Sequence, residues 1–236
     1  MSRWSYHIPI LGYHRVGVPR RDHVPTVSAE AFERQLALLA TLRYRVLSLA
    51  QLVSRLERGE QMPRHSVVIT FDDGYEETCT IAWPLLKRFN FPAAIFITPQ
   101  EVGTPGFLTW EQAAHMGKDG ILIGSHTLRH SYLPLVPPDR VMEELAESKR
   151  VIEERIGQPV KFLSYPVGGF TRQIQEQVRR AGYQAACTTN RVASLKGPDP
   201  FALRRIKMTE RDAIPFLFLA KLSGYYDLFR QLRAPS

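Results

Sequence analysis

The chain has 236 residues, of which 44% are hydrophobic, so it is long enough to bury the core of one barrel-sized domain. Its formal net charge is +8, but the lysines and arginines are scattered and no basic stripe carries stacking aromatic residues, which argues against a nucleic-acid partner. No apolar run reaches the roughly 18 residues of a membrane-spanning helix.

Strands and helices are predicted to alternate along the chain. Ser28 is a typical N-cap for the first helix, and the spacing Ser48-x-x-Gln51 predicts a capping box at the start of the second. In chain order we predict a strand at 7–14, a helix at 29–43, a helix from Ser48 to Arg58, a strand at 66–71, a helix at 76–89 interrupted by Pro84, a strand at 93–98, a short helix from Trp110, a strand at 121–125, a charged helix at 139–156, a strand at 160–165, a helix at 172–181, strands at 184–189 and 202–207, and a helix at 211–223.

This alternation predicts an α/β fold with a single domain over residues 1–236. Residues 93–98 form a continuous apolar run, which favours a parallel strand buried on both faces. Helix 139–156 carries Val141, Leu145 and Ile152 along one stripe and charged residues elsewhere, so we expect it on the outside of the sheet.

Two adjacent carboxylates end an apolar strand in the run Thr70-Phe71-Asp72-Asp73-Gly74-Tyr75. Side by side they repel each other, and loss of water makes both harder to ionise. A bound cation would remove the conflict, with one carboxylate on the metal and the other free for proton transfer. The alternative is an ordinary Asp-Gly turn in which both carboxylates are hydrated.

A second apolar run, Ile121 to Ile123, is followed by His126 and His130. Four residues apart, the two imidazoles can point at one place from a helical turn or a curled loop. Two histidines and one aspartate would form a three-ligand site with open positions, as a catalytic metal needs. A lone histidine is usually structural, and His7, His23, His65 and His115 are interpreted in that way.

These two segments resemble motifs of the polysaccharide deacetylase family, carbohydrate esterase family 4. Thr70-Phe71-Asp72-Asp73-Gly74 resembles its TFDDG motif, residues 126–130 its H-[S/T]-x-x-H motif, and Ser164-Tyr165-Pro166-Val167-Gly168 a degenerate form of its R-x-P-Y-G motif. The resemblance implies a distorted (β/α) barrel with about seven parallel strands. It also implies that Asp72 is the catalytic base and that Asp73, His126 and His130 bind a divalent metal, most commonly zinc.

The chain departs from the common pattern of this family in three ways. Ser164 stands where an arginine usually orients the base, Val167 replaces the usual tyrosine, and no Leu-x-His motif follows, because His130 is the last histidine. Residues 11–16 resemble the opening of a circularly permuted branch that includes poly-N-acetylglucosamine deacetylases, which implies that His14 is the general acid. The alternative for His14 is a structural residue that caps a strand.

For the missing arginine we look to residues 201–206, which resemble the L-P-R-I segment at the end of members of that branch. Arg205 could reach Asp72 and hold it ionised through a charge-assisted hydrogen bond, and Arg204 is a weaker candidate. A backbone N–H at Val167 is expected to stabilise the oxyanion, which does not depend on the side chain.

The implied activity is metal-dependent hydrolysis of N-acetyl groups on a polysaccharide or oligosaccharide that contains N-acetylglucosamine, with release of acetate. Tyr75, Trp110 and Pro166 are candidate substrate contacts, and ordinary core packing is the alternative for Tyr75 and Trp110. Peptidoglycan, chitin oligomers and O-acetylated xylan stay open as substrates. Two other functions are alternatives: a non-catalytic glycan-binding relative, and a metal-dependent amidase that acts on small cyclic amides.

Residues 1–6 lack the apolar core of a signal peptide, which predicts a cytoplasmic location; a periplasmic or cell-surface location is the alternative if a leader is missing. Cys79 and Cys187 are expected to be free thiols. The oligomeric state is left open. Weak association with a membrane surface is a further expectation, based on Phe216, Phe218, Tyr225, Tyr226 and Phe229 with Lys221, Arg230 and Arg233.

Overall fold

The computed structural model describes residues 8–20, 22–190 and 199–224. The predicted domain boundaries at 1 and 236 lie outside these residues, as do Tyr225, Tyr226, Phe229, Arg230 and Arg233 of the predicted membrane contact. Both cysteines are free, as predicted. Within the described part of the chain, no helix has the length and apolar character required to cross a membrane.

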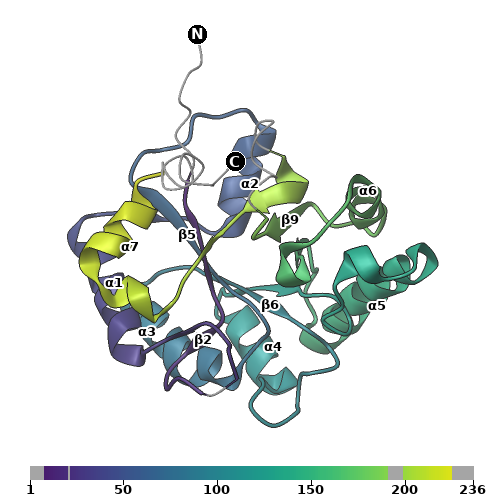
Figure 1. The fold of residues 1–236 in the computed structure, drawn as a ribbon, viewed down its shortest axis with the longest axis horizontal. Helices are drawn as coiled ribbons and strands as arrows, with labels where there is room; N and C mark the ends of the chain where they lie inside the picture. Colours follow the sequence, from purple (N-terminus) through teal and green to yellow (C-terminus); the bar gives the residue numbers. More distant parts are fainter. Residues whose placement is uncertain (1–7, 21, 191–198, 225–236) are drawn as a thin grey trace.

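A parallel β-sheet forms the centre of the molecule, with helices packed around it (Figure 1). The hydrogen-bonded order is β10-β9-β8-β7-β6-β5-β1-β11, and β4 pairs with β5 beside this path. The described strands are β1 (Ile10–Tyr13), β2 (Arg15–Val16), β3 (Thr26–Val27), β4 (Arg45–Val46), β5 (Ser66–Phe71), β6 (Ala94–Ile97), β7 (Leu122–Ser125), β8 (Phe162–Ser164), β9 (Ala185–Thr188), β10 (Leu203–Arg204) and β11 (Ile206–Lys207); β2 and β3 form a separate parallel pair.

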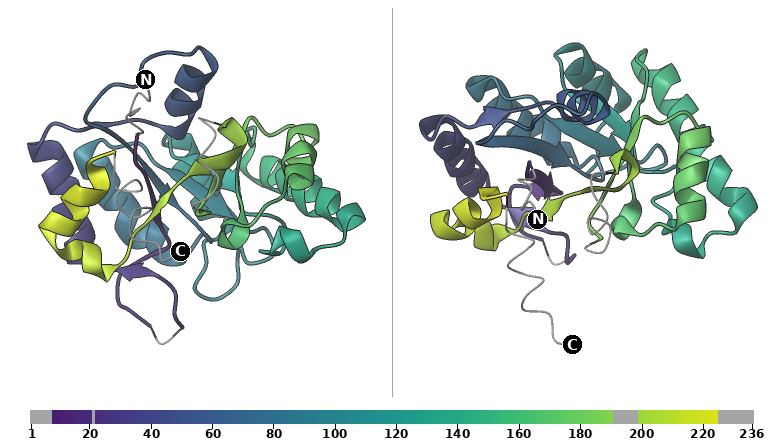
Figure 2. Two further views of the ribbon diagram at one scale, coloured as in Figure 1. Left: turned by 45° about the horizontal axis from the view of Figure 1, so that its top comes forward. Right: turned by 90° about the horizontal axis from the view of Figure 1, so that it is seen from above.

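One short segment closes the sheet into a nearly complete barrel. The strand predicted at 202–207 is in fact two strands, β10 and β11, separated only by Arg205. β10 pairs with β9 at one end of the sheet, whereas β11 pairs with β1 at the other. Figure 2 shows this yellow-green segment crossing between the two ends. If β10 and β11 are counted as one interrupted strand, the eight strands of the path become seven, as predicted.

The helices follow the predicted order, and the two predicted caps, Ser28 and Ser48, are confirmed. Ser48 and Thr109 each form a capping box, and Ser28 and Thr171 each accept a hydrogen bond from a backbone N–H of the first turn. The described α-helices are α1 (Ala29–Thr41), α2 (Leu49–Glu57), α3 (Trp83–Phe89), α4 (Trp110–Lys118), α5 (Pro138–Ile156), α6 (Arg172–Arg180) and α7 (Pro215–Leu222).

Two predicted helices are not regular α-helices over their whole length. The segment predicted as one helix at 76–89 contains a π-helical turn, Thr78–Ala82, before α3, and Pro84 lies in the first turn of α3. Proline has no N–H to donate, so it fits only at such a helix start. The helix predicted at 211–223 is a 3₁₀ turn, Glu210–Ala213, followed by α7, which also begins at a proline.

Buried apolar residues form two clusters that alternate along each strand. Leu11, Val67 and Ile69 belong to the cluster that lies under the outer helices, together with Leu36 of α1 and Leu145 of α5. The other cluster fills the barrel: its members are Ile8, Ile10, Val68, Ala94, Phe96, Phe162, Ala185, Cys187 and Leu203, with Leu49, Leu52 and Val53 of α2. Successive side chains of a strand point to opposite faces, so the sheet separates an inner core from an outer one.

Candidate metal centre and active site

The predicted site residues continue the inward-facing series of their strands by one more position. On β5 the inner residues Val68 and Thr70 lead to Asp72, and on β1 Ile10 and Gly12 lead to His14. β1 and β5 are parallel and in register, with Gly12 opposite Thr70, so the next inward pair is His14 and Asp72. The site therefore forms at the carboxyl end of the barrel strands, where the following loops converge.

Asp73 and the two histidines of the loop after β7 lie together, as predicted. Asp73 Oδ1 is 3.4 Å from Nε2 of His126 and 3.3 Å from Nε2 of His130. Ligand atoms of all three residues lie within 4.8 Å of one another. Asp73 and His126 are buried, whereas the side chain of His130 is about one-third exposed. The group thus has one open side toward solvent.

A backbone carbonyl fixes the orientation of His126. Its Nδ1 lies 2.7 Å from the carbonyl oxygen of Ser164, which can only accept a hydrogen bond. Nδ1 must therefore carry a proton, and Nε2 is the ring nitrogen that faces Asp73. Metal-binding histidines are commonly oriented in this way, through a hydrogen bond from the ring nitrogen that does not touch the metal.

The residues present fit a divalent cation. Asp73 Oδ1 is buried, yet it has no hydrogen-bond partner among the described residues although two imidazoles face it. A tetrahedral ion with ligand bonds of about 2.0–2.1 Å would hold its ligand atoms about 3.3 Å apart, close to the two separations measured from Asp73 Oδ1. Burial by itself would raise the pKa of Asp73, but His126 and His130 hold its pKa well below the ordinary value. The carboxylate is thus ionised and available as a ligand.

Arg205 forms a bidentate ion pair with Asp72. Its Nη1 donates to Oδ1 of Asp72 at 2.7 Å and its Nη2 donates to Oδ2 at 2.5 Å. The same guanidinium donates to the hydroxyls of Thr70 and Ser164. Burial would raise the pKa of Asp72, but the Arg205 charge and hydrogen bonds offset it, so the pKa lies below the ordinary value. Asp72 is held ionised, facing the Asp73 group.

The guanidinium of Arg205 enters from the closing strand, and Ser164 gives it room. Ser164 occupies the position of the usual arginine in the resembled motif, and its small hydroxyl accepts a hydrogen bond from Arg205 at 2.8 Å. Arg205 thus supplies to Asp72 the kind of contact that the motif places at 164. Sequence patterns suggested Arg205, but the contact between Ser164 and Arg205 was not predicted.

His14 lies beside Asp72, and most of its surface is covered. Burial lowers the pKa of His14 below its ordinary value, although the carboxylates of Asp72 and Asp73 act in the opposite direction. Its Nδ1 is buried and has no hydrogen-bond partner within the described part of the chain. Burial thus favours the neutral form of the imidazole, and no side chain among the described residues competes for its Nδ1.

The third motif forms a short 3₁₀ turn, Pro166–Gly168, directly after β8. Val167 has a φ of +57° and is 75% exposed, whereas Pro166 and Gly168 are buried. A left-handed conformation is unusual for a β-branched residue, and Asp73, Thr127 and His130 also have positive φ. Strain of about 1–3 kcal/mol at a β-branched residue such as Val167 or Thr127 persists only where surrounding contacts enforce it.

The two aromatic candidates for substrate contact differ in position. Tyr75 is close to the site: burial above all, and then the Asp73 carboxylate, raise its pKa. Its ring stacks on Phe107 and lies under the guanidinium of Arg15. Trp110 packs against the outer core, with its ring 5.8 Å from the guanidinium carbon of Arg155 on α5. These contacts favour the core-packing alternative for Trp110.

Sequence patterns did not indicate that Glu144 of α5 contacts the histidine loop. Glu144 is 3% exposed and accepts hydrogen bonds from the backbone N–H groups of Leu128 and Arg129. Ser125, at the end of β7, shares a hydrogen bond with Ser148 of the same helix. The spacing of Glu144 and Ser148 could have indicated that both are buried. Residues i and i+4 share a helix face, and these two lie on the same face as Leu145 and Ile152.

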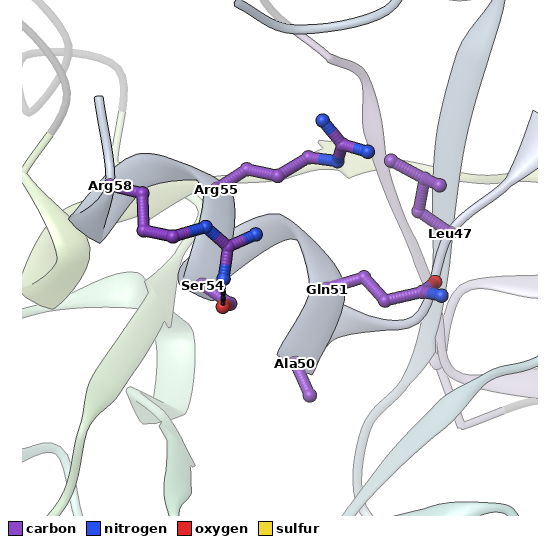
Figure 3. Close-up of a pocket in the computed structure, with 6 residues that line it drawn as sticks. All are labelled: Leu47, Ala50, Gln51, Ser54, Arg55 and Arg58. Atoms are coloured by element: carbon purple, nitrogen blue, oxygen red, sulfur yellow. Dashed lines mark hydrogen bonds between the residues drawn. The ribbon is translucent and has the colours of Figure 1, made fainter. Parts of the chain in front are cut away.

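A surface hollow elsewhere has none of this chemistry. It is lined by residues of α2, by Arg58 directly after this helix and by Leu47, as Figure 3 shows. Its two arginines, Arg55 and Arg58, are both paired with Glu60. α2 follows β4, which pairs with the amino-terminal end of β5, so this hollow lies at the opposite end of the barrel from Asp72.

Comparisons with known proteins show which folds and sequences this chain resembles. A solved structure of the Streptococcus pyogenes deacetylase PplD in complex with acetate superimposes with a TM-score of 0.82 over 91% of this chain and 97% of that one, at 24% identity, which shows the same fold. A Staphylococcus aureus (strain MSSA476) protein named poly-beta-1,6-N-acetyl-D-glucosamine N-deacetylase is 23% identical over 216 residues, which are 86% of this chain and 73% of that protein.

Two further matches identify the family. The Bacillus subtilis (strain 168) protein YxkH, which bears a provisional polysaccharide deacetylase name, is 31% identical over 202 residues, covering 86% of this chain and 71% of its own. The family model described as "Polysaccharide deacetylase" matches residues 59–186, which are more than half of the 236 residues and include the Asp72–Asp73 and His126–His130 segments. The chain therefore belongs to the polysaccharide deacetylase family.

Proposed function

We propose that this protein is a metal-dependent N-deacetylase that removes acetyl groups from N-acetylglucosamine residues of a polysaccharide or oligosaccharide. One observation carries the proposal: a carboxylate held ionised by Arg205 lies next to a second carboxylate that faces two imidazoles. The first can accept a proton, and the second set can hold a cation. Amide hydrolysis requires both functions at one place.

Asp73, His126 and His130 are the residues that would hold the cation. Zinc commonly takes imidazole and carboxylate ligands of this kind, so zinc is the proposed cation. When bound, a divalent cation polarises the acetyl carbonyl and lowers the pKa of water. Asp72 removes a proton from the attacking water, and Arg205 keeps this base ionised and fixed in direction. A backbone N–H at Val167 donates to the oxyanion that forms at the acetyl carbonyl; donors of this type typically contribute about 2.7–4 kcal/mol.

His14 donates a proton to the departing amine, since an amide nitrogen leaves poorly as an anion. Burial lowers the pKa of His14, which makes its protonated form a stronger acid while reducing the fraction that is protonated near pH 7. In the register of β1 and β5, His14 neighbours Asp72, so acid and base approach the substrate from the same side of the barrel mouth.

The substrate class rests on the name of a relative and on the openness of the site. The Staphylococcus aureus protein is named for poly-β-1,6-N-acetyl-D-glucosamine. Val167, in the turn directly after β8, is 75% exposed, so apolar surface is available there to a sugar chain. Chitin oligomers, peptidoglycan and O-acetylated xylan are the competing substrates, and the cellular compartment stays a prediction.

The test is acetate release from a panel that contains poly-β-1,6-N-acetylglucosamine, chitin oligomers, peptidoglycan fragments and acetylated xylan, after loading with zinc. We expect acetate from the first substrate and a loss of nearly all turnover in Asp72→Asn, with zinc content unchanged. Zinc binding without turnover on any member of the panel would support the non-catalytic glycan-binding alternative. Turnover only of a small cyclic amide would support the amidase alternative.

A further inference from the structure

The loop that carries the two histidines has an unfavourable backbone conformation. Thr127 and His130 have φ angles of +66° and +56°, and neither is glycine. Side chains at such positions crowd the backbone, and a β-branched residue such as Thr127 crowds it most. Free in solution, this segment would therefore favour other conformations, in which the two imidazoles would not both face Asp73. Contacts from outside the loop must select the observed one.

The first of these contacts comes from Glu144, on the inner face of α5. Its Oε2 accepts hydrogen bonds from the N–H groups of Leu128 and Arg129, both at 3.0 Å. Its Oε1 accepts a hydrogen bond from Nη1 of Arg129 at 2.8 Å. All of its strong contacts therefore go to the segment between the histidines, and the Arg129 charge balances that of the buried carboxylate.

A second contact comes from the same helix face, one turn later. Ser148 Oγ is 2.7 Å from Ser125 Oγ, and Ser125 Oγ accepts a hydrogen bond from the N–H of Thr127 at 3.1 Å. Glu144 and Ser148 together thus secure the N–H groups of three consecutive residues, 127, 128 and 129. These N–H groups lie between the two histidines, so their positions determine where both imidazoles point.

We propose that Glu144 is a positioning residue for the metal centre, which holds the histidine loop in its ligating conformation from α5, with Ser148 in a supporting role. This inference rests on the proposed metal-binding function of Asp73, His126 and His130. It predicts that metal affinity depends on a residue of an outer helix that does not face the metal group. Partners of this kind typically change metal affinity by about 10- to 100-fold.

The experiment measures zinc affinity of the metal-free full chain by competition with a chelating dye. Glu144→Gln keeps the size of the side chain, but an amide cannot accept from both backbone N–H groups and the guanidinium as the carboxylate does. We expect zinc binding to weaken by about 10- to 100-fold. Co²⁺ absorption spectra of the same variant should change in shape, since the geometry of the ligands changes.

Glu143→Gln is a matched control. Glu143 is the preceding residue of α5 and binds the same Arg129 side chain at 2.8 Å, but it is more exposed and the structure gives it no bond to the loop backbone. Exposed ion pairs contribute little, so the zinc affinity of this variant should stay within about twofold of the original.

The outcomes separate the inference from the function on which it rests. If the original chain does not bind zinc, the metal centre itself is wrong. If the original chain binds zinc and Glu144→Gln binds it equally well, Glu144 is merely a structural residue of α5. Should Glu144→Gln fail to fold, Ser148→Ala tests the other contact between α5 and the histidine loop. A loss of zinc affinity in Ser148→Ala, smaller than that expected for Glu144→Gln, supports the proposal, and unchanged affinity overturns it.

Discussion

At the scale of single residues, Asp72 and Asp73 are adjacent in sequence, but their carboxylates face different groups. Asp72 continues the inward series of β5 and faces a guanidinium. Asp73 has a φ of +70°, which turns its side chain away from that series and toward the two histidines. Because one carboxylate is neutralised by arginine and the other is available to a cation, the two charges do not need to share one counter-charge.

Replacement of Arg205 by alanine should move the acidic limb of the pH–rate profile upward. The base must be ionised, so activity falls as the pH drops through the pKa of Asp72. Arg205 lowers that pKa, and an arginine neighbour typically does so by about 1–3 units. Without Arg205, burial raises the pKa of Asp72. As the pH is lowered, activity is then lost at a higher pH than in the original protein. Rates of acetate release measured from pH 4 to 9 give the shift.

Arg204→Ala is the matched control for this measurement. Arg204 is the adjacent residue of an extended segment, so its side chain points to the opposite face. The acidic limb of the pH–rate profile of Arg204→Ala should coincide with that of the original protein. An unshifted limb in Arg205→Ala would show that the guanidinium does not set the pKa of the base.

Replacement of His14 by alanine should lower kcat by about 10²–10⁴-fold, the usual contribution of a general acid. Zinc content should be unchanged, because His14 does not belong to the Asp73–His126–His130 group. Elemental analysis of the purified variant checks this. Loss of zinc would make His14 a ligand. His115→Ala, at an exposed histidine of α4, should alter neither quantity.

The sequence predicted the residues of the site whose chemistry is local to a motif. Asp72, Asp73, His126 and His130 lie in two short runs directly after apolar strands, and the structure brings the metal-binding candidates together. Glu144 lies on the same face of α5 as Leu145 and Ile152, so its burial agrees with the helical pattern. Its hydrogen bonds to the histidine loop could not be predicted, because they depend on how α5 packs on the loop after β7.

At the scale of elements, the interior of the barrel is filled by side chains of matched size. Gly124 of β7 lies against Phe96 of β6, and a Cβ at Gly124 would come within 2.6 Å of the Phe96 ring and 2.9 Å of the Phe162 carbonyl oxygen. Gly12 of β1 faces Arg205 instead, and a Cβ there would meet its nearest atom at 3.6 Å. One glycine is therefore required by packing, whereas the other leaves normal van der Waals space.

We expect Gly124→Ala to lower the free energy of unfolding by about 1–3 kcal/mol, because the added methyl overpacks the barrel. Gly12→Ala should be neutral or stabilise by about 0.4–1 kcal/mol, because alanine restricts the unfolded chain. Urea denaturation of the two variants provides the comparison. Equal changes in the free energy of unfolding at both positions would show that the barrel interior rearranges to accommodate a methyl group at Gly124, contrary to the packing described here.

The elements that sequence patterns placed less well are those that depend on long-range pairing. Residues 202–207 have the composition of one strand, but their two halves pair with strands at opposite ends of the sheet. The turn of direction at Arg205 results from closure of the barrel, which no local pattern contains. By contrast, the start of α2 was predicted correctly because its capping box is local in sequence.

At the scale of the whole molecule, the site is assembled from both ends of the chain. His14 comes from the first strand of the barrel and Arg205 from the segment that closes it, while the metal-binding candidates lie between them in the sequence. The site therefore exists only when the barrel is closed. A ligand that binds this folded arrangement, and not the unfolded chain, must stabilise the fold as a whole.

Zinc should accordingly raise the melting temperature of the metal-free protein. At a free zinc concentration of 100 times Kd the stabilisation is about 2.7 kcal/mol. For a chain of this size, each kcal/mol raises Tm by about 2–4 °C, so we expect an increase of about 5–11 °C. In the double variant His126→Ala/His130→Ala the increase should vanish, because one carboxylate alone binds zinc weakly. An equal increase in that variant would place the stabilising zinc outside the Asp73 group, for example on exposed histidines such as His115.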